Sequence, residues 1–468
     1  MELIHKFSID GLKYVLDVNT GSIMEIDELV YDLLEDDRVL TLDEAIEKFS
    51  SKYSFDQIKE ALDEINNLVE EGVLYTKDMY EEKVKKNNEQ EYMKAMCLNV
   101  VHDCNLKCKY CFADEGEYKG KREIMTFDVA KRALDFLISQ SGPRYNIEVD
   151  LFGGEPLMAF DMIKQLVDYA RSIEKQANKN IRFTITTNGL LLNDEIIEYL
   201  NKNMKNIILS IDGRKEVNDK MRLTAVGTGS YDIIIDKIKK LVDGREEGQE
   251  YYLRGTYTHQ NLDFSNDFMH LVNEGFKEIS LEPVVVKDDS EISIRFEDLE
   301  QIYDEYDKIY RYLKDMIDDG KKINFYHYNI NLQGGPCVYK RVSACGAGFE
   351  YIAITPSGDI YPCHQFVGKK EFVIGNVNDL LNYGIREPQI VEEFKEANIY
   401  KKEDCNKCWA RFYCSGGCQA NNHEFTNSIL KPYKIGCYLQ KKRIEMAIAL
   451  KVYENSKDTY IKDRKSVV

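Results

Sequence analysis

The chain has 468 residues, enough for two to four domains, and its 43% hydrophobic and 31% charged residues are typical of a globular protein in water. The formal net charge of −18 disfavours nucleic acid as a partner, because a strongly acidic surface repels phosphate groups. No apolar run approaches the roughly 20 residues of a membrane span, and the first residues lack the apolar core of a signal peptide, so we expect a cytoplasmic protein with no membrane partner.

Residues 1–80 are expected to form a small separate module. Apolar and polar residues alternate at its start around a turn signal at residues 19–21, which predicts short paired strands. Three helical patterns follow, one of them opened by a capping-box signature at Thr41, and residues 73–76 are predicted to close the module as a strand. Strands followed by three helices resemble a winged-helix unit. The charged residues 81–95 are expected to be a linker.

Residues 96–322 alternate strand patterns with helix patterns. The six predicted strands are residues 96–101, 146–152, 181–187, 206–212, 252–258 and 278–284. Strands that alternate with helices predict a parallel sheet built from βα units. Six units are too few for a closed eight-stranded barrel. The predicted fold class is therefore α/β, with an open, partial (β/α)6 barrel.

Polar or glycine-rich motifs follow the first four predicted strands. A cysteine loop follows the first strand, and the motifs after the next three are Gly153–Pro156, Thr187–Gly189 and Ser210–Gly213. The carboxyl ends of parallel strands lie at one edge of such a sheet, where barrel enzymes place their active sites. These motifs are therefore expected to converge on one pocket.

The twelve cysteines fall into two groups, separated by roughly 225 residues that contain none. Disulfides are disfavoured in a reducing compartment, so clustered cysteines indicate metal or redox sites. The first group is Cys97, Cys104, Cys108 and Cys111, and the second is Cys337, Cys345, Cys363, Cys405, Cys408, Cys414, Cys418 and Cys437.

Cys104, Cys108 and Cys111 have the spacing C-x3-C-x2-C on a short loop. Three thiolates suit three irons of a [4Fe–4S] cluster, because soft sulfur ligands match iron–sulfur chemistry. The fourth iron is then open to a substrate or cofactor. The alternative is a structural zinc site completed by His102 or Cys97.

This spacing, with Tyr110 before the last cysteine and Gly-Gly-Glu-Pro after the second strand, resembles the signature of the radical S-adenosylmethionine (SAM) enzymes. The resemblance implies that the open iron chelates SAM. One electron then cleaves SAM to methionine and a 5′-deoxyadenosyl radical, which takes a hydrogen atom from the substrate.

The resemblance also implies SAM-binding residues. Tyr110 is expected to contact the adenine through its backbone, Gly153, Gly154 and Glu155 to hold the amino group, and Ser210 and Arg222 to hold the ribose and the carboxylate, with Asn188 and Asp212 as further candidates. The alternative for these positions is structural: a glycine turn, an ordinary residue at a strand end and a surface arginine.

Residues 323–455 contain the second cysteine group, and its spacing resembles the seven-cysteine SPASM extension of radical SAM enzymes. The resemblance implies two auxiliary [4Fe–4S] clusters, three clusters in all, whereas a zinc ribbon would explain only four of the seven cysteines. The implied ligands are Cys405, Cys408, Cys414 and Cys437 for a distal cluster, and Cys345, Cys363 and Cys418 for a nearer one. Cys337 is the candidate for an eighth ligand. The alternative is an open iron that binds a substrate thiolate.

One position departs from the family pattern. In sulfatase-maturating relatives, an aspartate that acts as a base follows the cysteine corresponding to Cys363, but here His364 stands there. This disfavours a serine- or cysteine-oxidising reaction of that type. His364 is the one candidate for a catalytic acid or base, and a surface or supporting histidine is the alternative.

The N-terminal module ahead of such a core resembles the recognition element of enzymes that modify ribosomally made peptides (RiPPs), which binds a leader peptide as an added strand. A stabilising or dimerising appendage is the alternative. The start of the chain and residues 334–368 resemble the maturases of SCIFF peptides, which implies a thioether between a peptide cysteine and an α-carbon. The implied partners are a precursor peptide and a reductase, flavodoxin or ferredoxin.

Two other functions stay open. One is another SPASM reaction, such as a carbon–carbon link or a thioether at a β- or γ-carbon. The other is a non-catalytic iron–sulfur protein that binds peptides or carries electrons. Residues 456–468 are expected to form a loose tail.

Overall fold

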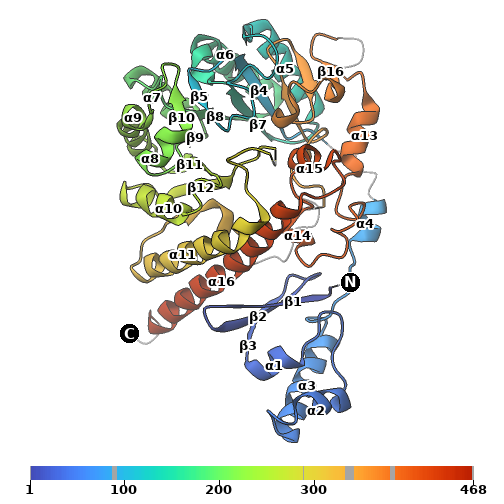
Figure 1. The fold of residues 1–468 in the computed structure, drawn as a ribbon. Helices are drawn as coiled ribbons and strands as arrows, with labels where there is room; N and C mark the ends of the chain where they lie inside the picture. Colours follow the sequence, from blue (N-terminus) through green and yellow to red (C-terminus); the bar gives the residue numbers. More distant parts are fainter. Residues whose placement is uncertain (1, 87–91, 288, 333–341, 380–384, 466–468) are drawn as a thin grey trace.

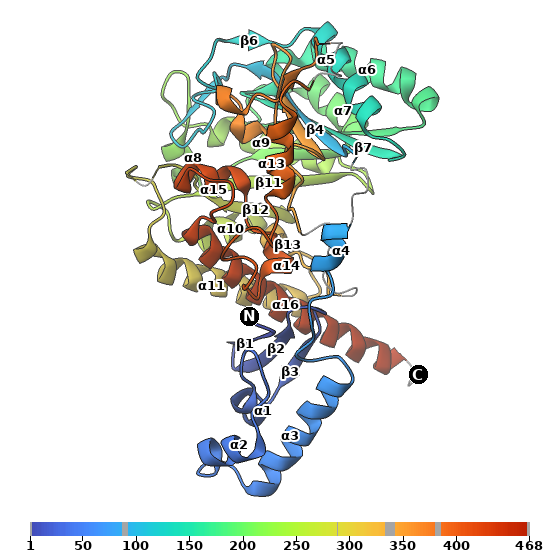
Figure 2. The same ribbon diagram turned by 90° about the vertical axis from the view of Figure 1, so that its right-hand side faces the viewer.

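The structure is a computed structural model that describes residues 2–86, 92–287, 289–332, 342–379 and 385–465. Figure 1 shows an N-terminal module below a large α/β layer, with the C-terminal segments packed between and beside them. Figure 2 shows the same arrangement from the side, with the short helix α14 next to the N-terminal strands. None of the helices in the described ranges combines the length and apolar character that crossing a membrane requires.

The N-terminal module consists of a three-stranded antiparallel sheet followed by three helices. Its elements are β1 (Ile4–Ile9), β2 (Leu12–Asp17), β3 (Ile23–Ile26), α1 (Glu28–Leu33), α2 (Leu42–Phe49) and α3 (Phe55–Glu70). The strands pair in the order β1-β2-β3, so β3 lies at an edge of this sheet. The predicted capping box is present: Thr41 accepts a bond from the Glu44 backbone, and Glu44 accepts one from the Thr41 backbone at 2.9 Å.

The strand predicted for residues 73–76 is wrong. Gly72 takes a left-handed φ of +70° after α3, and the backbone N–H groups of Val73 and Leu74 donate back to the carbonyl of Leu68. This is the hydrogen-bonding pattern of a helix end, and it uses the donors that a strand would have offered to a neighbour. Leu74 is instead buried in the core of the module.

All six strands predicted for the barrel are present. They are β4 (Ala95–His102), β7 (Asn146–Gly153), β8 (Asn180–Thr187), β9 (Asn206–Ser210), β11 (Glu250–Tyr257) and β12 (Glu278–Pro283), and they pair in parallel in this order. Among the described strands, β4 and β12 do not pair with each other, so the sheet does not close into a barrel. The α/β class and the open, parallel arrangement are confirmed.

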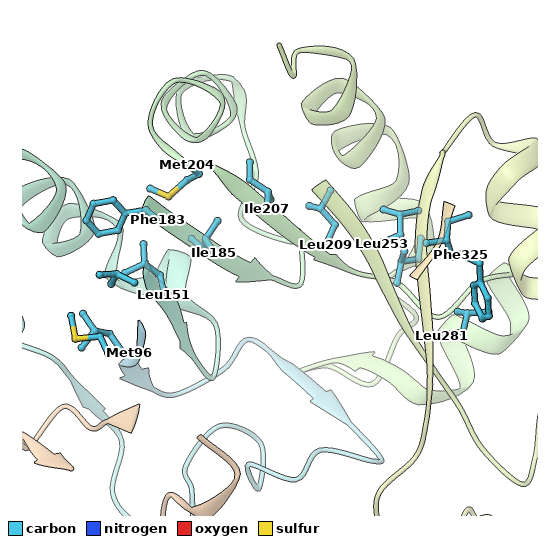
Figure 3. Packing of buried hydrophobic residues seen from close by; sticks show 14 of the residues in the cluster. Met96, Leu151, Phe183, Ile185, Met204, Ile207, Leu209, Leu253, Leu281 and Phe325 are labelled. Carbon is cyan, nitrogen blue, oxygen red and sulfur yellow. The ribbon is translucent and has the colours of Figure 1, made fainter. Parts of the chain in front are cut away.

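Helices cover one face of this sheet. They are α5 (Phe127–Gln140), α6 (Phe160–Ala177) after the short η1 (Pro156–Ala159), α7 (Asp194–Asn203), α8 (Lys215–Met221), α9 (Tyr231–Asp243), α10 (Phe264–Asn273) and α11 (Leu299–Asp318) after η2 (Phe296–Asp298). Alternate strand residues such as Leu151, Phe183 and Ile185 are fully buried against them, as Figure 3 shows. Because side chains alternate along a strand, the intervening residues face the concave inner side of the sheet.

The C-terminal part begins with β13 (Asn324–Phe325), which continues the sheet beyond β12, and the short helix η3 (Tyr326–Tyr328). It goes on with β14 (Tyr351–Ile354), β15 (Asp359–Tyr361), η4 (His364–Phe366), η5 (Lys370–Phe372), β16 (Gly375–Asn376), α13 (Pro388–Glu396), α14 (Arg411–Cys414), α15 (Gln419–Thr426) and α16 (Lys434–Lys465). Strand β14 pairs in parallel with β4. The barrel sheet therefore continues directly into the cysteine-rich part, which the sequence did not predict.

Two further expectations differ from the structure. The loose tail expected for residues 456–468 is helical as far as Lys465, because α16 packs along α11: the Tyr453 hydroxyl and the Lys457 ammonium reach Asp318 at 2.7 and 2.8 Å. The expected linker contains a helix, α4 (Glu81–Lys86).

Candidate active site

The loop that carries Cys104, Cys108 and Cys111 leaves the carboxyl end of β4. Its short strand β5 (Leu106–Cys108) pairs with β10 (Arg222–Thr224), which puts Cys108 opposite Arg222. The backbone N–H of Cys111 donates to the Cys108 carbonyl at 3.1 Å, so the loop turns between these two cysteines. Burial raises the pKa of Cys104 to about 12 and that of Cys108 to about 11, and the neighbouring thiols add to both shifts. The structure thus brings the three thiols together in a desolvated place.

Gly153 and Gly154 lie against the backbone that leads into this loop. The Gly154 N–H donates to the Val101 carbonyl at 2.9 Å. A Cβ atom on Gly153 would lie 2.2 Å from the Val101 oxygen, and one on Gly154 would lie 1.9 Å from the Asp103 oxygen. Only glycine permits this approach, so the motif fixes where the cysteine loop begins.

The carboxylate of Glu155 is fully buried and joins the ends of two strands. It accepts bonds from the Thr187 hydroxyl at 2.7 Å, from the Asn188 backbone at 2.8 Å and from the Leu157 backbone at 3.1 Å. A carboxylate offers about four acceptor positions, so three protein donors leave about one for a ligand. The main role of Glu155 in the structure is therefore to position the Thr187–Gly189 motif.

Asn188 connects that motif to the cysteine loop. Its amide nitrogen donates to the Asn105 side chain at 2.7 Å and lies 3.7 Å from the Cys104 sulfur. Its amide oxygen accepts a bond from the Leu190 backbone at 3.0 Å. The amide is therefore held at both ends, with an N–H group directed at a thiol.

Tyr110, Asp212 and Arg222 form a buried network on the other side of the loop. The Tyr110 hydroxyl donates to Asp212 at 2.7 Å and accepts a bond from Arg222 at 2.9 Å. Burial raises the pKa of Asp212 to about 6, against the opposing effects of Arg222 and Tyr110. In the described part of the chain, the Arg222 Nε has no hydrogen-bond partner although it is buried. This cation, beside Cys108, has a free donor for an anionic group.

Ser210 and His364 lie on the inner face of the sheet or at its rim. Ser210 is half-buried at the end of β9, beside Arg254 of β11. The His364 ring lies 5.1 Å from Phe152 and 5.9 Å from Phe112, and its Nδ1 is 3.4 Å from the Tyr351 hydroxyl. Burial, aided by Arg254, lowers the pKa of His364 to about 4. The structure therefore places a neutral imidazole next to the first cysteine loop.

The second cysteine group divides into two sets in space. Cys405, Cys408, Cys414 and Cys437 affect one another's ionisation, and burial raises the pKa of Cys405 to about 12 and that of Cys414 to about 11. Cys345 and Cys418 instead lie near Cys363. Burial raises the pKa of Cys363, and these two thiols raise it further. These are the two sets that the family resemblance implied. Cys337 lies outside the described residues.

Lys402 lies between the two sets. Its side chain is buried, its ammonium donates to the Gly416 carbonyl at 2.8 Å, and thiols of both sets oppose the lowering of its pKa by burial. A buried cation at this place lowers the cost of gathering anionic sulfur on both sides of it.

Two family comparisons bear on this arrangement. Residues 98–247 match the radical SAM superfamily, and residues 345–409 match an iron–sulfur cluster-binding domain, SPASM. The first match covers the loop of Cys104–Cys111 and the other three strand-end motifs, and the second covers Cys345, Cys363, Cys405 and Cys408 of the second cysteine group.

The chain is a radical SAM enzyme with a SPASM domain.

Relatives of this enzyme cover most of its length. It is 25% identical over 457 residues to the radical SAM cyclopropyl synthase TigE of Paramaledivibacter caminithermalis, which is 92% of this chain and 90% of that one. The structure of anSMEcpe with bound AdoMet and Cp18Cys peptide superposes with a TM-score of 0.63 at 21% identity, covering 78% of this chain and 99% of that chain. The structure of Streptococcus suis SuiB bound to precursor peptide SuiA superposes with a TM-score of 0.52 at 18% identity, covering 92% of this chain and 97% of that chain. Both likenesses show the fold.

The donor set of the radical SAM enzyme fits the cofactors of its family. That family uses a [4Fe–4S] cluster with SAM, and the SPASM domain holds auxiliary iron–sulfur clusters. Buried thiols with raised pKa values gain a compensating charge when they bind iron. The unpaired Arg222 donor suits the SAM carboxylate. The comparisons show an enzyme, which sets the non-catalytic alternative aside.

The zinc alternative finds little support in the positions of its two extra ligands. The His102 ring lies 4.6 Å from Tyr118 and is buried, while the neighbours of Cys97 are Tyr351, Asp150 and Cys363. Cys97 thus lies on the inner face of the sheet, toward the second cysteine group.

Sequence reasoning missed Asp150 and Tyr351. Asp150 alternates with the buried Val149 and Leu151 of β7, so it faces the inner side of the sheet. Burial and then Glu148 raise the pKa of Asp150 to about 7, while a hydrogen bond from Tyr351 opposes the rise. The signal for Asp150 was its polar position in the alternating pattern of β7.

Proposed function

We propose that this radical SAM enzyme matures a ribosomally made, cysteine-rich precursor peptide of the SCIFF type. In this proposal it joins a peptide cysteine sulfur to the α-carbon of another residue. The observation that carries the proposal is the N-terminal sheet, which lies next to the radical SAM and SPASM core and has β3 as an edge strand. SuiB, described with its precursor peptide, covers both parts of this chain.

The leader peptide is proposed to add to β3 as a fourth strand. Edge strands present unpaired backbone donors and acceptors, which a peptide in extended conformation satisfies. Residues Ile23–Ile26 are half-buried or exposed, so the strand is accessible along its length. Binding there would hold the core peptide at high effective concentration near the barrel.

The proposal assigns three [4Fe–4S] clusters. Cys104, Cys108 and Cys111 hold the first, with Tyr110, Gly153, Gly154, Glu155, Asn188, Ser210 and Arg222 around SAM. Cys405, Cys408, Cys414 and Cys437 hold the distal cluster, and Cys345, Cys363 and Cys418 hold the nearer one, which either Cys337 or a peptide thiolate completes. When bound, SAM and the first cluster supply the group that removes a hydrogen atom.

The crosslinking balances without an added oxygen. The α-carbon loses one hydrogen atom to that group, the cysteine thiol loses a proton, and the sulfur–carbon bond forms as one electron leaves. The auxiliary clusters are the proposed acceptors of this electron, and a reductase, flavodoxin or ferredoxin is the proposed external donor. His364 is the candidate group that accepts the proton of the peptide thiol.

The test is anaerobic incubation of the reduced enzyme with SAM and a short cysteine-rich peptide encoded beside its gene, followed by tandem mass spectrometry. A loss of two hydrogens together with one free thiol, placed at an α-carbon, supports the proposal. A second candidate is carbon–carbon bond formation, favoured by the similarity to the cyclopropyl synthase TigE. It predicts the same mass loss with every thiol retained.

A further inference from the structure

The segment between Cys408 and Cys414 is held by residues from the far end of the chain. The Trp409 backbone donates to the Glu2 carboxylate at 2.8 Å, and its indole stacks on the His5 ring at 3.7 Å with planes 5° apart. His5 in turn bonds Glu445 of α16 at 2.8 Å. The N-terminal module thus packs directly on the loop that carries half of the distal cysteine set.

Arg411 makes the most buried contact between this segment and the N-terminal module. Its side chain is fully buried, and its guanidinium donates to the Asn19 side-chain oxygen at 2.6 Å and to the Cys408 carbonyl at 3.2 Å. Asp78 lies 3.9 Å from it. Burying a guanidinium is costly unless its donors are bonded, and here, among the described residues, the two Nη atoms are hydrogen-bonded while the Nε is not. The two bonds fix both the side chain and the backbone at Cys408.

Asn19 is itself rigidly held. It lies in the turn between β2 and β3, its side-chain nitrogen donates to the Thr76 carbonyl at 2.6 Å, and its backbone donates to Asp17 at 3.2 Å. Asp17 also accepts bonds from the Thr20 and Thr76 backbones at 2.9 and 3.0 Å. The amide oxygen that meets Arg411 is therefore positioned by the fold of the N-terminal module.

We propose that Asn19 and Arg411 are positioning residues for the distal cysteine set, so that the N-terminal module is a structural part of an iron–sulfur site as well as a peptide-binding unit. The inference rests on the proposed assignment of Cys405, Cys408, Cys414 and Cys437 to a cluster. It does not depend on which peptide the enzyme modifies. It implies that the module cannot be removed without damage to that site.

The experiment uses the full-length holoenzyme, reconstituted anaerobically, in three forms: wild type, Asn19→Ala and Asn19→Asp. Asn19→Ala removes the acceptor for Arg411, whereas Asn19→Asp keeps an oxygen there and pairs it with the guanidinium. We expect Asn19→Ala to speed amide hydrogen exchange over residues 405–414 at least tenfold and to lose about four irons per chain. We expect Asn19→Asp to restore both in part, because it keeps the acceptor for Arg411 but loses the hydrogen bond to the Thr76 carbonyl.

Arg411→Gln is the second variant, and Arg386→Gln is the matched control, because Arg386 pairs with Asp379 outside this interface. Electron paramagnetic resonance of the reduced proteins should show the signal of one cluster altered in Arg411→Gln and all signals unchanged in Arg386→Gln. Wild-type exchange, iron content and spectra in a folded Asn19→Ala or Arg411→Gln protein overturn the inference. No peptide enters this test, so its failure is distinct from failure of the proposed peptide chemistry.

Discussion

The Tyr110 hydroxyl lies 2.7 Å from the Asp212 carboxylate, although 102 positions separate the two residues in the chain. The contact joins the cysteine loop after β4 to the end of β9, and Arg222 completes it by donating to the same hydroxyl at 2.9 Å. The tyrosine before the last cysteine of the motif therefore links the loop to the sheet through its side chain, whatever its backbone contacts.

Replacing Tyr110 by phenylalanine should weaken this link. The change leaves a buried carboxylate without one donor and a buried guanidinium without one acceptor, which costs about 1–3 kcal/mol of stability. We expect urea unfolding at lower concentration and about tenfold weaker SAM binding in calorimetry. Tyr145→Phe is the control, because the Tyr145 side chain is 57% exposed. Equal effects in both variants would contradict a specific role for the Tyr110 network.

Gly154→Ala should displace the cysteine loop. The added methyl group would lie 1.9 Å from the Asp103 oxygen, so the backbone before Cys104 has to move. We expect loss of the first cluster, read as about four fewer irons per chain and as absence of SAM cleavage. Gly120→Ala is the matched control, because its nearest atom is 3.3 Å away. A Gly154→Ala enzyme with full iron content would show that this close approach is dispensable.

The six barrel strands could be predicted from the sequence because the alternation of buried and exposed residues lies within each strand. In β8 the buried residues Ile181, Phe183 and Ile185 alternate with less buried ones, and that period identifies a strand without knowledge of its neighbours. The cysteine spacings likewise pointed to two sets that the structure places apart. Both signals are contained within short windows of sequence.

Other features depend on contacts between residues far apart in the chain, which a short stretch of sequence cannot indicate. The four residues of β14 form a strand because they pair with β4, more than 250 positions earlier. Asn19 and Arg411 are 392 positions apart, and neither stretch of sequence indicates the other. Residues 73–76 look like a strand locally, but bonds to Leu68 turn them back onto the preceding helix.

The pKa of Asp150, raised to about 7, should make stability depend on pH. Between about pH 4 and pH 7 the unfolded chain gives up this proton while the folded protein keeps it, so stability falls as pH rises through that window and is level above it. Asp150→Asn removes the ionisable group. We expect the variant to be more stable than wild type by about 2 kcal/mol at pH 8, and by less at pH 5.

Anaerobic urea unfolding of the holoenzyme at both pH values measures this difference. The groups around Asp150 stay unchanged in the variant: Glu148 on its own strand, Thr184 of β8, Cys97 of β4 and Tyr351 of β14. The control is Asp304→Asn, an exposed position on α11, for which no change between pH 5 and pH 8 is expected. A variant less stable than wild type at pH 8 would mean that Asp150 is ionised and paired in the folded protein.

The final prediction separates cysteines that bind iron from one that does not. Cys418 is exposed and lies with Cys345 and Cys363, so Cys418→Ala should lose the nearer cluster and about four irons, and should abolish crosslinking. Cys97 is 1% exposed and lies against Tyr351, and its thiol donates to the Asn99 side-chain oxygen at 3.6 Å, so it already has a partner within the protein.

Cys97→Ala should therefore keep about twelve irons per chain and cost about 1 kcal/mol of stability, as expected for the loss of a small buried side chain. Iron and zinc analysis of the two variants decides the matter. Loss of iron from Cys97→Ala would make Cys97 a ligand of the nearer cluster, and Cys337 would then not be needed there. Zinc in place of iron in the wild type would return the first cysteine group to a structural role, since zinc is not redox-active and cannot deliver the electron that SAM cleavage requires.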